Sequence, residues 1–489
     1  MAAPVASPLL SGASHPARPP PKYTSIPTEW KLELPSMGSD DSDLFGGCRR
    51  IEDSYERLAH LGQGTYGEVF KARDKKTGDV VAIKKIKMDT DNKEGFPITA
   101  LREIKILSRL AASDLKIDGH LLRDNIIRLR EIVRSDSSEA NKHRGSVYMV
   151  FDYMHHDMAG LLDRANREKV AKVPPGKSRG GAQQEPPFEI GQVKRYMKQL
   201  FLGLALLQAP VNNILHRDLK NANLLVSDRG ELKIADFGLA RGVLQNKTAS
   251  AADDGVKDSK NTKGSVKMTN KVITLWYRPP ELLLGCESYG KEVDMWSAGC
   301  IMAEILSGRP LFPGKDEATQ MDLICKTLGK PAEHNMPGCS KLKLYGDFVA
   351  NNPAAKNFPA GSKLASKLNE MKIRDPLAIQ LLESLLTLDP SKRISAAAAA
   401  SHHWFAAEPK MFTLDEMPRY EASHELTMKR KRMEEHAAMG GHHQPHVHRP
   451  PPALRGMGGG GGGGGGGGRM MHPPSGRMDV KPSWDTGKR

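Results

Sequence analysis

The stretch that decides the fold is His216-Arg217-Asp218-Leu219-Lys220-Asn221-Ala222-Asn223, which is followed by Asp236-Phe237-Gly238. An acid at position 218 is suited to accept or orient a hydroxyl proton. Asn223 and Asp236 supply the hard oxygen ligands that Mg²⁺ prefers. Either motif alone could be a surface turn with an ion pair. Together, with two further motifs upstream, they favour phosphoryl-transfer chemistry.

A glycine pattern upstream, Gly62-Gln63-Gly64-Thr65-Tyr66-Gly67-Glu68-Val69, has the spacing G-x-G-x-x-G-x-V. The G-x-G-x-x-G part is a weak signal on its own, because turns without a ligand also contain it. A dinucleotide site needs a helix after the glycines, whereas β-branched and aromatic residues follow here and predict a strand. A strand–glycine loop–strand hairpin lets backbone N–H groups close over phosphates without side-chain clashes.

A lysine and a glutamate complete the constellation. Lys84 ends the strand-like stretch Val81-Ala82-Ile83-Lys84, 22 residues after Gly62. A lysine that points from a strand into a cleft neutralises phosphate charge, and Glu103, on a predicted helix, would hold it in place. The alternative for each is an ordinary side chain facing solvent.

The order of predicted elements indicates an α+β fold with two lobes. Strand-like segments fill most of residues 55–87, and a helix is expected over 97–110. Apolar residues recur at three- and four-residue steps over 190–207, which predicts a buried helix. Two short strands are expected within 222–235, and the pattern from 280 to 404 is helical.

Composition sets the outer limits. Gly and Pro make up 80 of the 489 residues, so part of the chain is not expected to fold. No apolar run reaches 18 residues, which excludes an ordinary transmembrane helix and predicts no membrane partner. The N-terminus lacks the features of a secretory signal, although its scarcity of acids leaves an organelle transit peptide open. Five scattered cysteines favour a reducing compartment over a disulfide scaffold or zinc site.

The net charge of +15 is uneven, because residues 428–489 alone carry +7. The run Lys429-Arg430-Lys431-Arg432 is a nuclear-localisation candidate, with a solvated helix end as the alternative, and the expected location is the nucleus. The basic tail could also contact nucleic acid non-specifically. The histidines between 436 and 448 could bind metal, but in a low-complexity segment an incidental cluster is the simpler interpretation.

Over Ser54–Phe405 the motifs together resemble the eukaryotic protein kinases. The resemblance implies a bilobal protein kinase fold, with a small, mostly antiparallel β lobe that carries one key helix, and a larger helical lobe. One departure is Arg278-Pro279-Pro280-Glu281, where A-P-E is usual. Since one branch of kinases is similar there, it does not weaken the assignment.

The resemblance and the composition together divide the chain into four parts. We expect a disordered segment at 1–49 and a kinase domain at 50–405, with lobes at 50–154 and 155–405. An extension with the basic run follows at 406–435, and a His/Pro/Gly-rich tail at 436–489. Three polar stretches, at 135–146, 164–185 and 242–267, are expected to be surface insertions.

The branch is also readable. Pro97-Ile98-Thr99-Ala100-Leu101-Arg102-Glu103, the segment Thr269–Glu281 and the hinge-like Phe151–Met154 resemble cyclin-dependent kinases. The combination is most similar to the transcription-elongation branch, including the plant C-type kinases. Residues 418–432 resemble the extension of that branch, with His424 and Glu425 matching its His-Glu pair. In relatives this extension reaches the nucleotide site; the alternative is a solvated basic tail.

The resemblance assigns roles to individual residues, with ATP and Mg²⁺ as cofactors. Asp218 would orient the substrate hydroxyl, Lys220 would sit near the transferring phosphate, and Lys84 would contact the nucleotide phosphates. Asn223 and Asp236 would hold Mg²⁺. The remaining ATP-binding residues are expected to be Leu61, Gly62, Gly64, Gly67, Val69, Ala82, Glu103, Phe151, Asp152, Met154 and Asp157.

The resemblance also implies regulation. A cyclin, of T-type or similar, would cover the helix that carries Phe96, Ile98, Leu101 and Ile104, whose alternative role is core packing. Thr269 matches the site phosphorylated by an activating kinase. The arginines expected to gather that phosphate are Arg102, Arg217 and Arg241. Thr65 and Tyr66 match inhibitory phosphosites of some cell-cycle relatives.

The expected reaction is phosphorylation of Ser or Thr before Pro, with the RNA polymerase II C-terminal repeat as the preferred candidate and promotion of transcription elongation as the result. A cell-cycle-type kinase acting on other Ser/Thr-Pro sites is the alternative. A pseudokinase scaffold would lack a catalytic residue, and none is missing. An RNA-binding protein would need an aromatic RNP motif, and none is present.

Overall fold

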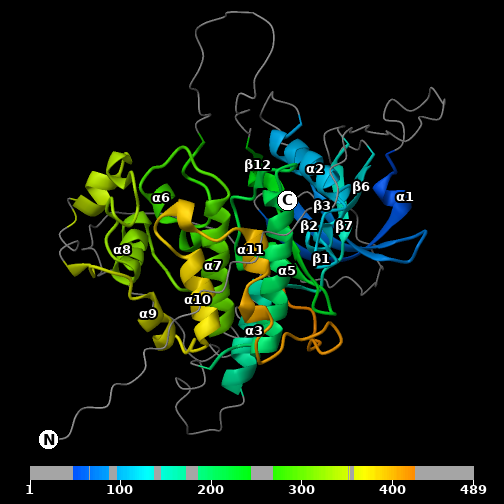
Figure 1. Ribbon diagram of the computed structural model, residues 1–489. Helices are drawn as coiled ribbons and strands as arrows, with labels where there is room; N and C mark the ends of the chain where they lie inside the picture. Colours follow the sequence, from blue (N-terminus) through cyan, green and yellow to red (C-terminus); the bar gives the residue numbers. More distant parts are fainter. Residues whose placement is uncertain are drawn as a thin grey trace, which may run out of the picture.

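The computed structural model describes residues 48–64, 67–87, 96–136, 145–171, 185–243, 268–350, 352 and 357–424. The smaller lobe, blue and cyan in Figure 1, contains a five-stranded antiparallel sheet in the order β1-β2-β3-β7-β6. Its strands are β1 (Tyr55–Gly64), β2 (Gly67–Asp74), β3 (Val80–Lys85), β6 (Leu129–Arg134) and β7 (Val147–Asp152).

Alternation along β3 positions the site. Val81 and Ile83 are fully buried and pack with Phe70 and Tyr148 in a small core of their own. Because neighbouring side chains of a strand point to opposite faces, Ala82 and Lys84 lie on the other face. That face of the sheet looks toward the larger lobe, so the strand register places Lys84 in the space between the lobes.

The key helix of the small lobe is α2 (Ile98–Ala111), which begins after Pro97. Its buried residues are Ala100, Glu103, Ile106, Leu107 and Leu110, at the three- and four-residue steps of one helical face. The helix packs against the turn Phe237–Leu239 of the large lobe. This contact fixes Glu103 opposite the strand that carries Lys84.

The folded part begins slightly earlier than the sequence predicted, because Arg49 already belongs to it. Its guanidinium lies 3.0 Å from Asp74 and is also bonded to Glu131. The short helix α1 (Ile51–Ser54) follows and buries Ile51. Paired charges leave no periodic signal in a sequence, so the expected boundary after residue 49 was late.

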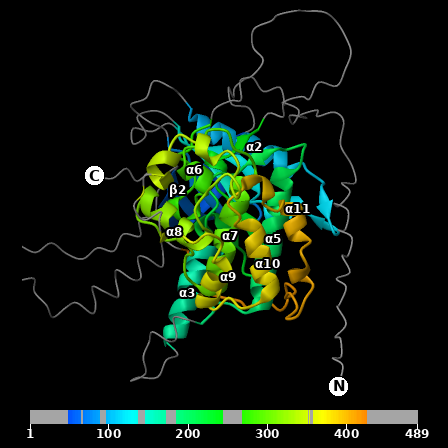
Figure 2. The same ribbon diagram turned by 60° about the vertical axis from the view of Figure 1, so that its left-hand side comes forward.

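The larger lobe is helical and is centred on α5 (Ile190–Gln208), almost every residue of which is buried. Figure 2 shows α5, α7 and α10 packed together, and α11 contacts α5. The other helices of this lobe are α3 (Met158–Ala171), α6 (Pro280–Leu283), α7 (Glu292–Ser307), α8 (Glu317–Leu328), α9 (Leu364–Glu370), α10 (Pro376–Leu385) and α11 (Ala396–Ala400).

Short strands line the boundary between the lobes. A three-stranded sheet has the order β11-β10-β8, and two-stranded pairs join β12 to β9 and β4 to β5. These strands are β4 (Lys116–Ile117), β5 (His120–Leu121), β8 (His156–Asp157), β9 (Ile214–Leu215), β10 (Leu224–Val226), β11 (Leu232–Ile234) and β12 (Arg241–Gly242). The β10–β11 hairpin confirms the two short strands expected within 222–235.

One expected insertion is partly wrong. The stretch 164–185 was predicted to be a surface loop, but its start continues α3, in which Ala165 is buried. Arg164 lies 2.7 Å from Glu168, one helical turn later. Arg164 also donates to the carbonyl oxygen of Glu421, so its charge serves contacts of a helix rather than those of a polar loop. Residues 172–184 lie outside the described part.

Within the residues the structure describes, no helix has the length and apolar character needed to cross a bilayer. All five cysteines fall in described segments and are unpaired.

Candidate active site

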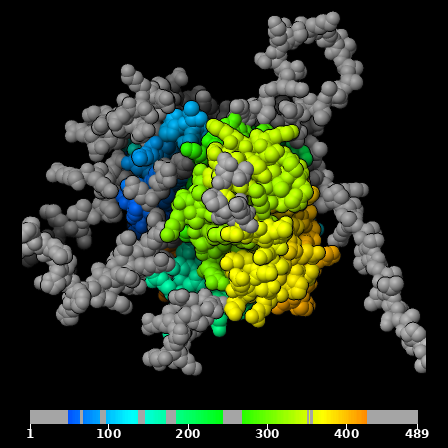
Figure 3. Space-filling view, turned by 90° about the vertical axis from the view of Figure 1, so that its left-hand side faces the viewer, coloured from blue at the N-terminus to red at the C-terminus, as the bar shows by residue number. Residues whose placement is uncertain are grey.

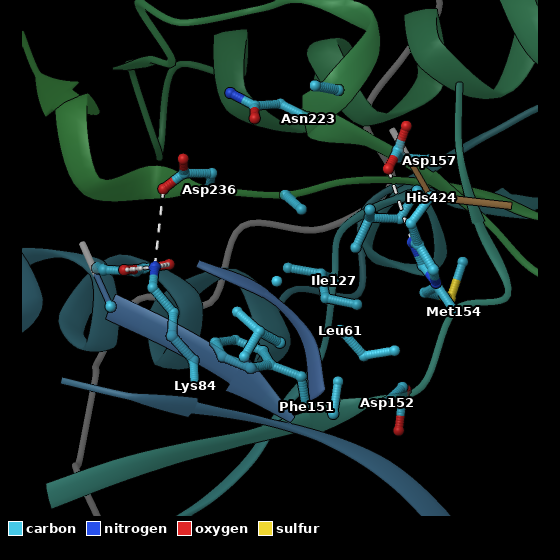
Figure 4. Close-up of a pocket in the computed structure, with 18 of the residues that line it drawn as sticks. Leu61, Lys84, Ile127, Phe151, Asp152, Met154, Asp157, Asn223, Asp236 and His424 are labelled. Atoms are coloured by element: carbon cyan, nitrogen blue, oxygen red, sulfur yellow. Dashed lines mark hydrogen bonds and ion pairs between the residues drawn. The ribbon is translucent and has the colours of Figure 1, made fainter. Parts of the chain in front are cut away.

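A cavity of about 390 Å³ lies between the two lobes. Figure 4 shows side chains from both lobes pointing into it, with Lys84 below and Asn223, Asp236 and Asp157 above. The lining residues are Leu61, Gly62, Gly67, Val69, Ala82, Lys84, Glu103, Ile127, Phe151, Asp152, Met154, Asp157, Lys220, Ala222, Asn223, Leu225, Ala235, Asp236 and His424. The structure thus brings together almost every residue expected to contact the nucleotide. Gly64, at the tip of the hairpin, is not in the lining.

The roof of the cavity is the hairpin of β1 and β2, in which Gly64 pairs with Gly67. Gly67 has a φ of +148°, and a Cβ placed there would lie 1.9 Å from the carbonyl oxygen of Lys85. Only glycine fits such an approach. Thr65 and Tyr66 lie outside the described residues, so their expected regulatory role stays a prediction.

Lys84 and Glu103 form an ion pair inside the cavity. The Lys84 Nζ donates to Glu103 Oε1 at 3.1 Å and to Oε2 at 2.9 Å. Burial raises the pKa of Glu103, while the ammonium of Lys84 opposes this and favours the carboxylate. Lys84 Nζ also lies 3.7 Å from Asp236 Oδ1, marked by a dashed line in Figure 4. The pair positions one cationic group at the centre of the cavity.

Asp236 is held in an unusual conformation. Its backbone is left-handed, with a φ of 64°. The next side chain, Phe237, is fully buried, and the centroid of its ring lies 4.9 Å from the centroid of the His216 ring. The buried Asp236 Oδ1 accepts no hydrogen bond. A strained backbone and an unbonded carboxylate oxygen at a cavity are features of functional sites.

Asn223 faces the same space with its amide oxygen. Its Nδ2 donates to the carbonyl oxygen of Asp218 at 2.7 Å and to the Asp218 Oδ2 at 3.1 Å. The amide nitrogen is therefore engaged, which leaves the oxygen for a cation. Mg²⁺ is commonly held by one or two protein oxygens together with substrate phosphates and water. Asn223 and Asp236 fit this pattern. The described residues contain no cluster of three or more His, Cys, Asp or Glu suited to a metal.

Asp218 is positioned by three side chains. Lys220 Nζ lies 2.8 Å from its Oδ2, and the hydroxyl of Thr274 donates to its Oδ1 at 3.0 Å. Both carboxylate oxygens are thus oriented, with Asn223 as the third partner. Thr274 was missed as a site residue, although it lies within the segment that resembles an activation loop.

A buried carboxylate holds the motif that carries Asp218. Asp294, on α7, accepts from the backbone N–H of His216 at 2.8 Å and of Arg217 at 3.0 Å. Burial raises the pKa of Asp294, and these donors oppose the rise. Asp294 belongs to none of the motifs that the sequence shows. An acid within an otherwise apolar helix was the available signal, because such a group needs buried partners.

The expected phosphorylation site, Thr269, is exposed. The hydroxyl of Tyr289 donates to the carbonyl oxygen of Thr269 at 2.7 Å, and Arg217 Nη1 donates to the same hydroxyl at 3.3 Å. Arg241 pairs with Leu215, two residues before Arg217. The structure thus links Arg217 to Thr269 through one tyrosine and places Arg241 nearby, while Arg102 sits on α2.

The C-terminal extension reaches the cavity, as the resemblance implied. His424 lines it, and the Nδ1 of His424 lies 3.6 Å from Asp157 Oδ2 (Figure 4). Just before it, Ser423 donates its backbone N–H to the Nδ1 of His156 at 3.1 Å. Burial, reinforced by neighbouring cationic groups, lowers the pKa of His156 to about 4. Glu425 and the basic run at 429–432 lie outside the described residues.

Comparisons with known proteins agree with this geometry. The family described as the protein kinase domain matches residues 55–405. Cyclin-dependent kinase C-1 of Oryza sativa subsp. japonica is 42% identical over 81% of this chain and 67% of its own length. Cyclin-dependent kinase C-2 of Arabidopsis thaliana is 41% identical over 79% of this chain and 65% of its own length. Cyclin-dependent kinase 9 of Danio rerio is 40% identical over 74% of this chain and 83% of its own length.

Solved structures are similar as well. The CAK complex of Chaetomium thermophilum bound to ATP-gamma-S contains a chain 32% identical, with a TM-score of 0.58, covering 76% of this chain and 96% of that one. The yeast RNA Pol II CTD kinase CTDK-1 complex contains a chain that is 32% identical, with a TM-score of 0.55. The match covers 74% of this chain and 95% of that one. The chain spans about two thirds of the length of the plant relatives. It belongs to the protein kinase family and, within it, to the cyclin-dependent Ser/Thr kinases of the transcription type.

Proposed function

We propose that this chain, activated by a cyclin, transfers the γ-phosphate of ATP to Ser or Thr followed by Pro, and that its substrate is the RNA polymerase II C-terminal repeat. The observation that carries the proposal is the oriented Asp218, whose two carboxylate oxygens are bonded by Lys220, Asn223 and Thr274. Phosphoryl transfer asks the protein mainly for positioning and charge neutralisation.

Each group of the cavity has one task in this reaction. Lys84, fixed by Glu103, neutralises charge on the nucleotide phosphates. Asn223 and Asp236 would hold Mg²⁺, which supplies further neutralisation of phosphate charge when bound. Asp218 accepts a hydrogen bond from the substrate hydroxyl and orients it, and Lys220 places a positive charge beside the acceptor.

The preference for proline after the acceptor is supported by the backbone of Ile273. This residue has a φ of 67°, and its carbonyl oxygen accepts from Arg278 Nε at 3.2 Å and Nη2 at 3.1 Å. It directly precedes Thr274, which bonds Asp218. With this carbonyl turned to Arg278, a substrate N–H passing here finds no acceptor. Proline has no N–H to satisfy and therefore binds without that loss.

The exposed face of α2 supports the proposal that a cyclin binds this chain. Ile98 is 70% exposed and Leu101 is 52% exposed, one helical turn apart. Phe96 and Ile104, which the sequence also offered to a partner, pack partly buried against the core. Two large apolar side chains side by side in solvent mark a protein contact. The two solved relatives are complexes.

The choice of substrate rests on the transcription-type relatives, one of which is described as an RNA Pol II CTD kinase. We infer the nucleus as the location from the same relation and from the basic run at 429–432. The test is a kinase assay with full-length chain co-purified with its cyclin, on polymerase heptad peptides and on histone. We expect faster phosphorylation of the heptads, and a fall of about 10³-fold in Asp218→Asn.

The matched control is Asp228→Asn, which changes a surface acid. The heptad peptide with Ala in place of each Pro should be phosphorylated far more slowly. Faster phosphorylation of histone than of heptads would replace the polymerase assignment with the cell-cycle alternative. Activity that survives Asp218→Asn would contradict the catalytic assignment itself.

A further inference from the structure

A second cavity, of about 490 Å³, lies in the larger lobe away from the nucleotide cavity. It is formed by the loop Arg309–Pro313 after α7, by α8, and by α9 with the residues beside it. Figure 3 views the molecule from the side that carries α8 and α9. We refer to this cavity as the basic groove. Its lining residues are Arg309, Pro310, Leu311, Phe312, Pro313, Leu323, Lys326, Thr327, Lys363, Ser366, Lys367, Glu370 and Met371.

The groove combines an apolar floor with a cationic rim. Leu311, Phe312 and Met371 are buried in its floor, and two prolines border them. Four of its lining residues are cationic, namely Arg309, Lys326, Lys363 and Lys367, and one, Glu370, is acidic. Such a surface is complementary to a ligand that carries negative charge next to an apolar group.

Part of the rim charge is already engaged, and part is available. Lys367 lies 3.4 Å from the carboxylate of Glu370, and Arg309 donates Nη2 to the backbone carbonyl of Glu370 at 2.9 Å. Lys326, on α8, and Lys363, just before α9, also line the groove and are exposed. Glu370 can neutralise one of the four cations, so a net positive charge remains for a ligand.

Two hydrogen bonds join the activation segment to the loop and the helix that form the groove. The indole Nε1 of Trp276 donates to the carbonyl oxygen of Gly314, the residue after the floor loop, at 2.9 Å. Trp276 lies two residues after Thr274, which bonds Asp218. Arg278 also bonds Glu317, the first residue of α8, at 2.6 Å. An extended substrate that leaves the cleft along Trp276 would therefore pass the loop and the helix that form the groove.

We propose that the basic groove binds a phosphorylated Ser-Pro or Thr-Pro segment of the protein substrate while a second acceptor occupies the cleft. The proposal rests on the proposed function, since that reaction itself creates such segments. A phosphoserine adds roughly −1.5 to −2 charges, which match the free rim lysines. The adjacent proline and its apolar neighbour fit the apolar floor. In a repetitive substrate the product of one turnover tethers the next acceptor and raises its effective concentration.

The test measures binding to the full-length chain by fluorescence polarisation, so it does not depend on kinase activity. The probes are a labelled two-heptad polymerase peptide with one phosphoserine before proline, the same peptide without phosphate, and inorganic phosphate as a competitor. The variant is Lys326→Glu with Lys363→Glu, both exposed and outside the catalytic residues. The control, Lys76→Glu with Lys410→Glu, makes the same charge change at exposed positions outside the groove.

We expect the phosphorylated peptide to bind about tenfold more tightly than the unmodified one, a difference of about 1.4 kcal/mol. The groove variant should lose this preference and the control should keep it. Equal binding of both peptides, or a preference that survives in the groove variant, overturns the proposal. Complete displacement of the phosphorylated peptide by millimolar inorganic phosphate alone also overturns the proposal, because the site would then recognise only an anion and not the peptide.

A kinetic arm separates this inference from the proposed function. The groove variant should phosphorylate a single unmodified heptad at the normal rate but show a raised KM for the pre-phosphorylated two-heptad peptide. If the groove variant phosphorylates the single heptad normally and its KM is unchanged for both peptides, the groove proposal is wrong and the proposed function stands. A chain inactive on heptads that still binds the phosphorylated peptide through the groove would overturn the proposed function and leave only the binding of the phosphorylated segment to the groove.

Discussion

At the level of single side chains, Asp236 combines a left-handed backbone with a buried carboxylate oxygen that accepts no hydrogen bond. Each feature costs about 1 kcal/mol or more in the folded state. The nearest cation, Lys84, is shared with Glu103. The cluster therefore carries more negative than positive charge until a cation enters, and this disposes it to bind one.

This predicts that Asp236→Asn separates stability from activity. Asparagine tolerates the left-handed conformation and removes the excess negative charge. The melting temperature should stay the same or rise by about 2–4 °C, while kinase activity should fall by at least 10²-fold because the proposed Mg²⁺ ligand is lost. The added stabilisation by Mg²⁺ and ATP in a thermal-shift assay should also shrink. A variant that melts much lower would show that Asp236 is a structural residue.

His156 provides a second prediction at this scale, because its pKa is lowered to about 4 by burial, with His155, His424 and Arg164 adding to the effect and Asp157 opposing it. Its ordinary pKa is about 6.5. In the unfolded chain His156 binds a proton below that value, whereas in the folded chain it stays neutral. The contribution of the neutral His156 to the free energy of unfolding is therefore fully present above pH 6.5. It is lost as the pH drops from 6.5 to 4, which lowers the free energy of unfolding by about 3 kcal/mol.

The measurement is the free energy of unfolding in urea between pH 7 and pH 4, for the parent chain and for His156→Asn. We expect a smaller loss of stability at low pH in the variant, because the neutral Asn does not titrate. Identical pH dependence in both proteins would mean that His156 does not contribute.

At the level of elements, α2 has two functions on two faces. Its inner face holds Glu103 against Lys84, and its outer face presents Ile98 and Leu101 to solvent. Any partner that covers the outer face thus acts on the position of Glu103 through a rigid helix. Under the proposed function, cyclin binding and nucleotide positioning would therefore depend on the same element.

The double substitution Ile98→Glu and Leu101→Glu should abolish co-purification of the cyclin. Both side chains are exposed, so the isolated chain should keep its melting temperature within about 2 °C. The matched control is Leu58→Glu, at an apolar side chain 38% exposed on β1. Normal cyclin recovery with the α2 variant would locate the partner elsewhere.

The activation segment supports another prediction. A phosphate on exposed Thr269 would lie beside Tyr289 and the arginine that bonds it, Arg217. Charge-assisted bonds would order the segment that carries Thr274. Thr269→Ala should therefore lower the activity of the cyclin complex by about tenfold or more, with cyclin binding retained. Unchanged activity would remove Thr269 from the regulation of this kinase.

At the level of the whole molecule, a buried ion pair joins segments far apart in the sequence. Arg393 donates to both carboxylate oxygens of Glu281, at 2.6 and 2.7 Å, and both side chains are almost completely buried. Glu281 closes the activation segment, and Arg393 follows α10 near the end of the kinase fold. The pair therefore anchors the substrate-facing segment to the helical core.

Arg393→Met should destabilise the protein by about 3–5 kcal/mol, because Glu281 would stay buried without its partner. Thermal unfolding should show a large fall in melting temperature. Lys410→Met, which removes an exposed partner of Glu408, serves as the control and should change little. Adding Glu281→Leu to Arg393→Met should restore part of the loss, and failure to do so would mean that packing around Arg393 dominates.

Much of the fold and site could be predicted from the sequence because the motifs fix residue types at fixed spacings. The hairpin over the cavity, the helix with Glu103 and the two short strands before Asp236 were all expected and are all present. The part that could not be predicted depends on contacts between distant segments. Asp294 and Thr274 support Asp218 from elsewhere in the fold. Charged residues of α3 hid a helix, and Arg49 gave no periodic signal.

The return of the chain at Ser423 and His424 has a practical consequence for inhibitor chemistry. The wall formed by His424 beside Asp157 comes from a residue outside the matched kinase domain. A chain truncated after Phe405 would lack this wall and would leave the carboxylate of Asp157 without its histidine neighbour. Compounds optimised against the shortened form would be selected for a cavity without this wall.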